Sequence, residues 1–423
     1  MAKSLAERDK AIIWHPYTQM KTIADPIGIV KGEGVYLIDE TGKKYIDAVS
    51  SWWVNLHGHS HPHIAKRVSE QLYTLEHAIF AGFTHSPAIE LAEGLLNILP
   101  ANQAKIFYSD NGSTAVEVAL KMCLQYWSNK GEPRKKVLAF NNSYHGDTFG
   151  AMAVSARSAF TAPFESLLFD VVYVDTPNAE NIDHLKAQIS NFKSQISSFI
   201  YEPLVQGSAG MLMYGAKYLD ELLDHCRQNN VFLIADEVMT GFGRTGKIFA
   251  SDYLTNTPDI VCLSKGLTGG TMALGVTSCT QQIFDAFLSE DKLKTFFHGH
   301  SFTANPIACA AAIASLELTL APENLENIRR ISDSHSRFAQ KISGHRKLRD
   351  IRQTGTILAF EWETEGNSSY FSGLRDNLYV YFLNEGIILR PLGNIIYILP
   401  PYCITNQQLD FIYSKIEEAL ELF

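Results

Sequence analysis

Two stretches decide the fold: Val-Phe-Leu-Ile-Ala-Asp-Glu-Val (Val231–Val238) and Asp-Ile-Val-Cys-Leu-Ser-Lys-Gly (Asp259–Gly266). Each contains an apolar run of strand length, as expected of strands that are buried on both faces of a parallel sheet. Asp236 follows the first run and Lys265 follows the second. The residues between them are numerous enough for the chain to cross over to a neighbouring parallel strand. Because ligands bind at the carboxyl ends of such strands, we expect this carboxylate and this amine to lie close together.

A carboxylate and an amine at one edge of a sheet suit pyridoxal phosphate. The amine of Lys265 can condense with the aldehyde of this cofactor, and the carboxylate of Asp236 can keep its pyridine nitrogen protonated. A protonated ring accepts electrons from a bound substrate. The two stretches therefore predict a pyridoxal phosphate site.

The turn between the two strands also spells two glycine patterns that bind other ligands. Gly241–Gly246 reads as the dinucleotide motif G-x-G-x-x-G, and Gly241–Lys247 reads as most of a P-loop. A P-loop needs Ser or Thr next, but Ile248 follows. The dinucleotide motif needs an acidic residue at the end of a second strand, whereas Asp259 begins one. Both patterns argue weakly for a nucleotide-binding protein, which remains the rival interpretation from another functional class.

Composition excludes several other classes. The chain has 423 residues, 46% of them hydrophobic, with a formal net charge of −9 and no basic block. This balance argues against nucleic acid and against a membrane surface as partners. No run reaches the ~18 apolar residues of a membrane span, and the charged N-terminus is not that of a secretory signal. Six cysteines, scattered singly, fit a reducing compartment, so we expect the cytoplasm.

The remaining pattern predicts an α/β protein with a smaller second unit. Strand-like and helix-like segments alternate from about residue 100 to residue 270, which is typical of a mostly parallel central sheet flanked by helices. From Asn324 onward the pattern changes to that of an α+β unit. We expect residues 51–320 to form a large cofactor-binding domain and 321–423 a small domain, which the segment 1–50 joins.

Two further segments invite a ligand. His57-Gly-His-Ser-His-Pro-His63 has the composition of a metal site, but spacing alone supplies no closed set of ligands, so we predict a loop and no metal. Asp110-Asn-Gly112-Ser113-Thr follows a short strand and begins a helix. Free N–H groups at a helix start favour a phosphate, although an ordinary capped helix explains the same residues.

Taken together, these motifs resemble a known family. Five of them occur in the chain in this order: Asn111-Gly-Ser113, Tyr144-His-Gly146, Glu202-Pro203, Asp236–Gly246 and Ser264-Lys-Gly266. With this set, the chain is similar to the class III (ω-amino acid type) aminotransferases of the fold type I pyridoxal phosphate family over nearly its whole length. A second set is similar to the biotin-pathway members of that family: Trp14–Met20, Ser51-Trp-Trp53, Tyr144–Gly150 and Arg390–Gly393.

The resemblance implies roles around the cofactor. Lys265 would bind it covalently and then move a proton between the substrate carbon and the cofactor. Asp236 would pair with the pyridinium nitrogen, and Tyr144 would stack on the ring. Gly112 and Ser113 would present backbone N–H groups to the phosphate.

The resemblance also implies a homodimer with shared sites. In the family, a Thr in a Gly-Pro-Thr loop of the other subunit reaches the phosphate. Here the loop reads Gly299-His300-Ser301, so Ser301 keeps the hydroxyl group while His300 replaces the proline. We expect Ser301 to bind the phosphate held by the second subunit.

For the substrates, the resemblance implies transfer of an amino group from S-adenosylmethionine to 8-amino-7-oxononanoate, giving 7,8-diaminononanoate. Arg390 would bind the carboxylate of the oxo-acid, and aromatic faces would suit the sulfonium and the adenine of the donor. Tyr17 is expected to take part in catalysis. The expected substrate-binding residues are Tyr17, Trp52, Trp53, Tyr144, Lys265, Gly299 and Arg390. Burial in the core would equally explain the two tryptophans. Lysine as donor, or another ω-amino acid as substrate, are the alternatives.

Three further residues in or near the motifs are expected to form contacts around the site. Arg244 follows Asp236 in the glycine-rich turn and is a candidate for a carboxylate contact, either with substrate or in a salt bridge. His145 is expected to be a hydrogen-bonding residue rather than a base, and Glu202 to anchor a hydrogen-bond network beside the cofactor.

Overall fold

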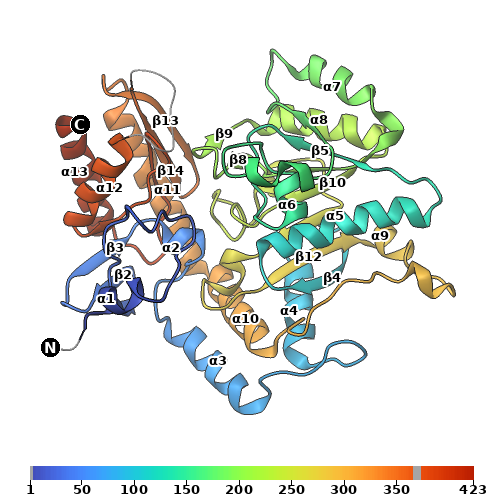
Figure 1. Cartoon of the computed structure of the whole chain (residues 1–423), viewed down its shortest axis with the longest axis horizontal. Coiled ribbons are helices and arrows are strands. Elements are labelled where there is room, and N and C mark those ends of the chain that lie inside the picture. The colour runs from blue at the N-terminus through green and yellow to red at the C-terminus, as the bar shows by residue number, and fades with distance from the viewer. Residues whose placement is uncertain (1–2, 365–372) are drawn as a thin grey trace.

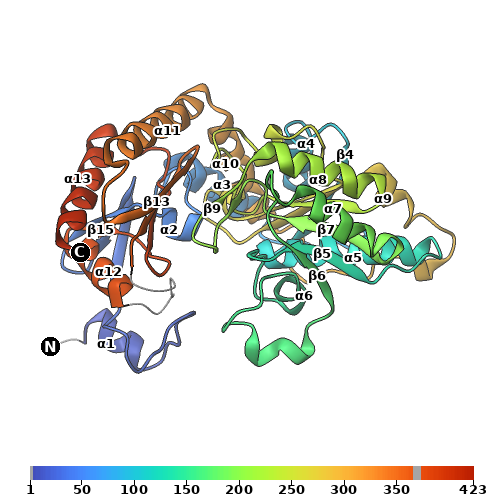
Figure 2. The same cartoon turned by 90° about the horizontal axis from the view of Figure 1, so that it is seen from above.

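The computed structural model describes residues 3–364 and 373–423 (Figure 1). The middle of the chain forms one body around a large sheet. The blue N-terminal strands and the orange-red C-terminal elements form a second body beside it, and both chain ends lie there (Figures 1 and 2).

Seven strands form the central sheet, in the order β4-β12-β11-β10-β7-β5-β6. Four neighbouring pairs are parallel, from β11 through β10, β7 and β5 to β6. Only β12 runs against its neighbours β11 and β4, so the predicted mostly parallel sheet is confirmed. The strands are β4 (Gln103–Ser109), β5 (Lys136–Phe140), β6 (Val171–Val174), β7 (Ile196–Tyr201), β10 (Phe232–Asp236), β11 (Ile260–Leu263) and β12 (Gly275–Thr280).

Alternate side chains of these strands pack into two cores, one on each face of the sheet. Leu138 and Phe140 belong to a core that also contains residues of α4 and α8, whereas Val137 and Ala139 belong to a core that contains residues of α5. Figure 2 shows α8 and α5 on opposite sides of the sheet. The helices of this body are α3 (Pro62–Thr74), α4 (Ser86–Leu96), α5 (Gly112–Asn129), α6 (Phe149–Ala153), α7 (Ile182–Ser190), α8 (Ala216–Gln228), α9 (Gln281–Asp285) and α10 (Pro306–Leu320).

Both ends of the chain build the second body. One sheet has the order β1-β2-β3-β15, with Ile387 of β15 beside Ile46 of β3, and a second has the order β13-β14-β16. The division into domains 1–50, 51–320 and 321–423 stays a prediction. The elements are α1 (Leu5–Lys10), β1 (Ile29–Glu33), β2 (Tyr36–Asp39), β3 (Lys44–Asp47), α2 (Ser50–Trp53), α11 (Pro322–Ile342), β13 (Leu348–Thr354), β14 (Ile357–Trp362), α12 (Gly373–Asn384), β15 (Ile387–Ile388), β16 (Ile395–Ile398) and α13 (Asn406–Leu422).

A two-stranded hairpin of β8 (Val205–Gln206) and β9 (Leu212–Met213) lies between the two bodies, where β9 contacts β13. The sequence pattern predicts a helix over residues 372–384; Ser372 lies outside the described residues, and within them α12 covers Gly373–Asn384.

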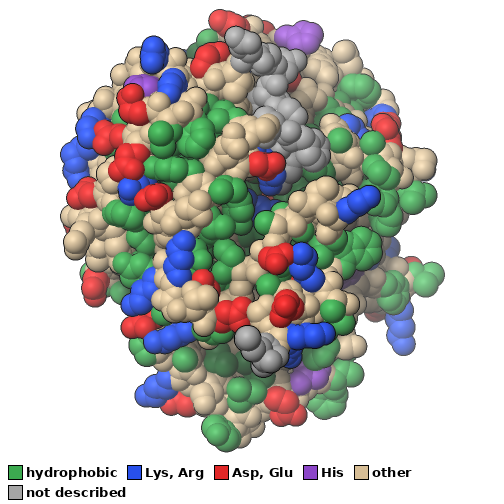
Figure 3. All heavy atoms as spheres, turned by 60° about the vertical axis from the view of Figure 1, so that its left-hand side comes forward, with side chains coloured by type: hydrophobic (Ala, Val, Ile, Leu, Met, Phe, Trp, Pro, Cys, Tyr) green, Lys and Arg blue, Asp and Glu red, His purple; other side chains and the backbone are tan. Residues whose placement is uncertain are grey.

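Two further features concern the length of the helices and the charges on the surface. Among the described residues, no single helix has the length and apolarity to cross a bilayer, although α10 and α11, which meet at a 66° bend, pass that test as a pair by length and composition. On the face seen in Figure 3, acidic and basic side chains are interspersed over the surface.

Candidate active site

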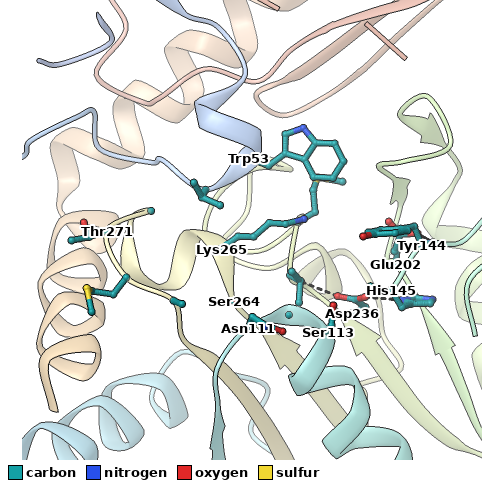
Figure 4. A pocket seen from close by; sticks show the side chains of 18 residues that line it. Trp53, Asn111, Ser113, Tyr144, His145, Glu202, Asp236, Ser264, Lys265 and Thr271 are labelled. Carbon is teal, nitrogen blue, oxygen red and sulfur yellow. Dashed lines mark hydrogen bonds and ion pairs between the residues drawn. The ribbon is translucent and has the colours of Figure 1, made fainter. Parts of the chain in front are cut away.

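The main cavity lies at the carboxyl ends of the central strands and has a volume of about 410 Å³. Segments that are far apart in the sequence line it (Figure 4). The polar and aromatic lining residues are Trp53, Asn111, Ser113, Tyr144, His145, Glu202, Asp236, Ser264, Lys265 and Thr271.

Asp236 and Lys265 both line this cavity. Asp236 is the last residue of β10, and Lys265 stands two residues beyond the end of β11. The two strands are parallel neighbours, with Ile234 beside Ile260. The structure thus brings together the carboxylate and the amine that the sequence places on adjacent strand ends.

A buried histidine orients Asp236. The Nδ1 atom of His145 lies 2.6 Å from Oδ2 of Asp236, and Oδ1 accepts the backbone N–H of Val238 at 3.1 Å. Both side chains are almost wholly buried. A histidine that donates to a buried carboxylate fixes the orientation of that carboxylate. His145 is therefore a hydrogen-bonding partner of Asp236, which sequence alone did not pair with it.

Glu202 forms a second buried carboxylate beside this pair. Its two oxygens accept the backbone N–H groups of Tyr144 and Gly207, each at 3.0 Å. Burial, reinforced by the charge of Asp236 and opposed by His145, raises the pKa of Glu202 to about 7. These hydrogen bonds connect the segment that carries Tyr144 to the β8–β9 hairpin.

Lys265 stands in an environment that favours a neutral amine. Its side chain keeps some surface open to the cavity, but protein surrounds it. This burial lowers the pKa of Lys265 to about 8, although the charges of Asp236 and Glu202 oppose the shift. Its Nζ atom lies 4.4 Å from the ring centroid of Trp53. A buried lysine with a lowered pKa is typical of a nucleophilic amine.

The start of α5 provides a place for an anion. Asn111 caps the helix by accepting the backbone N–H of Thr114 at 3.0 Å, and Gly112 and Ser113 line the cavity. The first N–H groups of a helix have no partners inside the helix and attract a phosphate. The start of α5 is thus an ordinary capped helix start, and it also faces the cavity.

Two glycines keep this place free of side chains. A Cβ atom on Gly112 would lie 2.7 Å from Val238, and one on Gly146 would lie 2.0 Å from Oγ of Ser113. Gly146 also has a φ of 134°, which disfavours any side chain. A flat heterocycle with an anionic tail therefore fits the cavity, between a nucleophilic amine, a buried carboxylate and an open helix start.

A second group of predicted site residues gathers around Tyr144. The hydroxyl of Tyr17 donates to Asp147 at 2.7 Å and lies 3.4 Å from the hydroxyl of Tyr144. Burial raises the pKa of Tyr144, and the contact with the Tyr17 hydroxyl is the second cause of this rise. The phenol of Tyr144 therefore stays protonated. The ring of Tyr17 meets Trp52 edge-on at 5.7 Å, and the guanidinium of Arg390 lies 4.2 Å from the centroid of Trp52. The structure therefore groups Tyr17, Trp52 and Arg390 as neighbours.

The two tryptophans have different surroundings. Trp52 is 38% exposed, whereas Trp53 is 4% exposed and lines the cavity. Core burial accordingly explains Trp53 as well as a site role does, but it does not explain Trp52. Ser50, Ser51, Trp52 and Trp53 all have left-handed backbone, with φ of 51°, 46°, 68° and 74°. Such conformations are costly for residues with side chains and concentrate at functional sites, and no pattern in the sequence indicated this turn.

Gly299, His300 and Ser301 lie outside this cavity. Gly299 and Ser301 are exposed, and Nδ1 of His300 lies 3.3 Å from the carboxylate of Asp110. The loop thus lies beside the start of α5 but does not reach the cavity of its own chain. The shared-site role of Ser301 stays a prediction.

In place of the salt bridge that was one expectation for Arg244, the structure shows contacts with backbone carbonyls. The guanidinium is buried and donates to the backbone carbonyls of Pro400 at 2.9 Å and Asn55 at 3.2 Å, and it stands over the ring of Tyr402. Burial lowers its pKa. Arg244 therefore joins the turn after β10 to the second body. Carbonyl oxygens from distant segments supply the acceptors, and sequence spacing cannot indicate them.

The glycine patterns around Arg244 also have structural roles. The amine of Lys247 donates to the carbonyl of Asp252 at 2.7 Å, and only a short 3₁₀ turn, Ala250–Tyr253, follows. A P-loop would instead open a helix directly. Elsewhere among the described residues, no group of three or more His, Cys, Asp or Glu is placed to hold a metal ion. In the histidine segment, Nε2 of His59 lies 3.0 Å from Asp47.

Sequence comparisons relate this chain to known aminotransferases. The family model "Aminotransferase class-III" matches residues 18–420. The adenosylmethionine-8-amino-7-oxononanoate aminotransferase of Synechococcus elongatus is 46% identical over 97% of this chain and 98% of its own length. The enzyme with the same name from Geobacter sulfurreducens is 39% identical over 99% of this chain and 97% of its own.

Solved structures agree. The crystal structure of the Methanocaldococcus jannaschii enzyme of that name has a TM-score of 0.95 at 36% identity, covering 99% of this chain and 98% of that one. An omega transaminase from Pseudomonas jessenii, solved in complex with PMP, has a TM-score of 0.93 at 27% identity over 99% of this chain and 98% of its own. The chain therefore belongs to the class III aminotransferases, a family of enzymes that depend on pyridoxal phosphate.

Proposed function

We propose that this enzyme transfers an amino group from S-adenosylmethionine to 8-amino-7-oxononanoate, giving 7,8-diaminononanoate, a step of biotin biosynthesis. The observation that carries the proposal is the cavity between the ends of β10 and β11, where Lys265 and Asp236 face the open start of α5. The choice of substrates rests on relatives of that name, which are similar over nearly the whole chain.

The residues around the cavity suit the chemistry of this cofactor. When bound, pyridoxal phosphate supplies an electron sink for the bond that breaks next to the transferred nitrogen. Lys265 would hold the cofactor and, once released by the incoming amine, would carry a proton between two carbons. Its pKa of about 8 leaves a useful neutral fraction near neutral pH. Asp236, oriented by His145, would keep the pyridine nitrogen protonated.

Binding of the phosphate and the ring would fall to neighbouring residues. Gly112 and Ser113 would donate backbone N–H groups to the phosphate, and Tyr144 would pack on the face of the ring. All three line the cavity. The charge of the phosphate would also be favoured by the dipole of α5.

Two substrates would use the site in turn. The Arg390 guanidinium would bind the carboxylate of the oxo-acid, since a planar fork matches a carboxylate well. Trp52 and Trp53 would offer aromatic faces to the aliphatic chain and to the sulfonium and adenine of the donor. Tyr17, which donates to Asp147, would border the reacting atoms from the side of Tyr144.

We further propose that the active form is a homodimer in the cytoplasm. Exposed apolar side chains gather on two segments, 73–83 and 297–302. These segments are neighbours, since the ring centroids of His77 and Phe302 lie 5.3 Å apart. A large exposed apolar area favours association with a second copy. The loop with Gly299 and Ser301 adjoins this area, so association would carry Ser301 toward the phosphate of the partner. The six free cysteines suit a reducing compartment.

The experiment is an absorption spectrum of the purified enzyme with each candidate donor in turn. S-adenosylmethionine should bleach the band of the bound cofactor, and addition of 8-amino-7-oxononanoate should restore it and yield 7,8-diaminononanoate. Bleaching by lysine, and not by S-adenosylmethionine, would replace the donor in this proposal. A protein that binds ATP and shows no such band would refute it.

A further inference from the structure

Tyr397 lies next to the cavity without belonging to any of the motifs. It is part of β16 and is 1% exposed. Its hydroxyl oxygen accepts the indole N–H of Trp53 at 3.0 Å, and the two rings meet edge-on at 6.1 Å and 66°. A hydrogen bond and a ring contact together fix both the position and the rotation of an indole.

The same indole faces the central lysine. Nζ of Lys265 lies 4.4 Å from the ring centroid of Trp53, within the range of a cation–π contact (Figure 4). The negative face of the ring favours a positive charge on that nitrogen, and burial of the site strengthens the effect. The position of the ring therefore influences the charge state of the nitrogen.

The turn that carries Trp53 has an unfavourable backbone conformation. The turn Ser50–Trp53 is left-handed throughout, a conformation that side chains disfavour. The residue after β16 supports this turn: the Ser50 hydroxyl donates to the carbonyl of Leu399 at 2.7 Å, and the backbone N–H of Leu399 donates to the carbonyl of Ala48 at 2.8 Å. Tyr397 completes this support at the side chain.

We propose that Tyr397 is a positioning residue that holds the indole of Trp53 against the amine nitrogen of Lys265. Through this contact, the sheet β13-β14-β16 helps to set the charge on the nitrogen that binds the cofactor. The inference rests on the proposed role of Lys265 and does not depend on which amino donor is used.

The test is a pH titration of the absorption band of the holoenzyme, measured without any substrate. Tyr397→Phe removes one end of the hydrogen bond and Trp53→Phe removes the other, while both keep an aromatic ring. A looser ring stabilises the positive charge on Nζ less well. The midpoint of the titration should therefore fall in each variant, by up to about half a pH unit.

The double variant separates positioning from general stability. If Tyr397 acts through Trp53, Tyr397→Phe should cause no further fall in the Trp53→Phe background. Tyr413→Phe is the matched control, since Tyr413 is also buried and its hydroxyl lies 2.7 Å from Nδ1 of His335, on α11 in the second body. Its midpoint should equal that of the unaltered enzyme.

Two outcomes would overturn the proposal: an unchanged midpoint in Tyr397→Phe, or an equal fall caused by Tyr397→Phe in the presence and absence of the indole. Failure of S-adenosylmethionine to react would leave the titration unaffected, because the titration uses no donor. A protein without any cofactor band would instead overturn the proposed function and this inference together.

Discussion

The pKa of Lys265 makes a quantitative prediction about loading of the cofactor. Only a neutral amine attacks an aldehyde, and burial lowers the pKa of this amine from 10.5 to about 8. At pH ~7 the neutral fraction is then about 10%, compared with about 0.03% for an ordinary lysine. The neutral amine of Lys265 is consequently about 300-fold more abundant at neutral pH than that of an ordinary lysine, which favours its reaction with the aldehyde.

The assay follows the rate at which apoenzyme gains its absorption band after addition of pyridoxal phosphate, across a series of pH values. The rate should rise with pH through a midpoint of about 8 and then level off, because deprotonation of the Lys265 amine is complete at higher pH. Lys265→Ala should gain no such band and show negligible turnover. A rate that keeps rising to about pH 10 would refute the proposed environment of Lys265.

Three further predictions address other parts of the site. Burial places the pKa of Glu202 at about 7 in the folded protein, above its ordinary 4.5, so its stabilising contribution is complete below the ordinary value and is lost as pH rises through 7. In Glu202→Gln, the fall in unfolding free energy of the apoenzyme between pH ~5 and ~8 should shrink by about 2 kcal/mol, as urea titrations would measure; an equal fall in both proteins would contradict this. Ser301→Ala should weaken cofactor binding up to about tenfold in a fluorescence titration, since one hydrogen bond is lost, and unchanged affinity would count against a shared site. Gly146→Ala would place a Cβ atom 2.0 Å from Oγ of Ser113 at a φ of 134°. It should lower the unfolding free energy by about 1–3 kcal/mol and reduce cofactor occupancy, whereas full occupancy at normal stability would show that the cradle tolerates a side chain.

The central strands were predictable because they are buried on both faces. The apolar runs that end at Asp236 and Leu263 are typical of strands in a parallel sheet, and the polar groups that follow such strands emerge at their carboxyl ends. The start of α5 was equally clear, since Asn111 is a favourable capping residue that follows a strand. These features depend on local sequence, which is why the sequence sufficed.

The sequence pattern did not predict the antiparallel strand β12. Its sequence, Gly-Val-Thr-Ser-Cys-Thr, is too polar for a strand that is buried on both faces. The structure supplies partners for two of the three hydroxyl groups: Thr277 donates to the carbonyl of Ala115 at 2.8 Å, and Ser278 donates to the side-chain oxygen of Gln103 at 2.7 Å. Polar side chains are tolerated in a core when specific partners satisfy them, and those partners come from distant segments.

The sequence also could not predict the site residues that act through contacts with distant segments. Tyr397 lies in an apolar strand with no motif, and its importance depends on the indole of Trp53, far away in the chain. Arg244 looked suited to a carboxylate but binds two backbone carbonyls. In both cases the partners come from segments far away in the chain, which no local pattern encodes.

The most direct measurement of the central claim is borohydride reduction of the purified enzyme, followed by peptide mapping. Reduction should bleach the yellow protein and leave the pyridoxyl mass on the single peptide that contains Lys265. A colourless protein, or the added mass on any other lysine, would contradict the placement of the cofactor between Lys265 and Asp236.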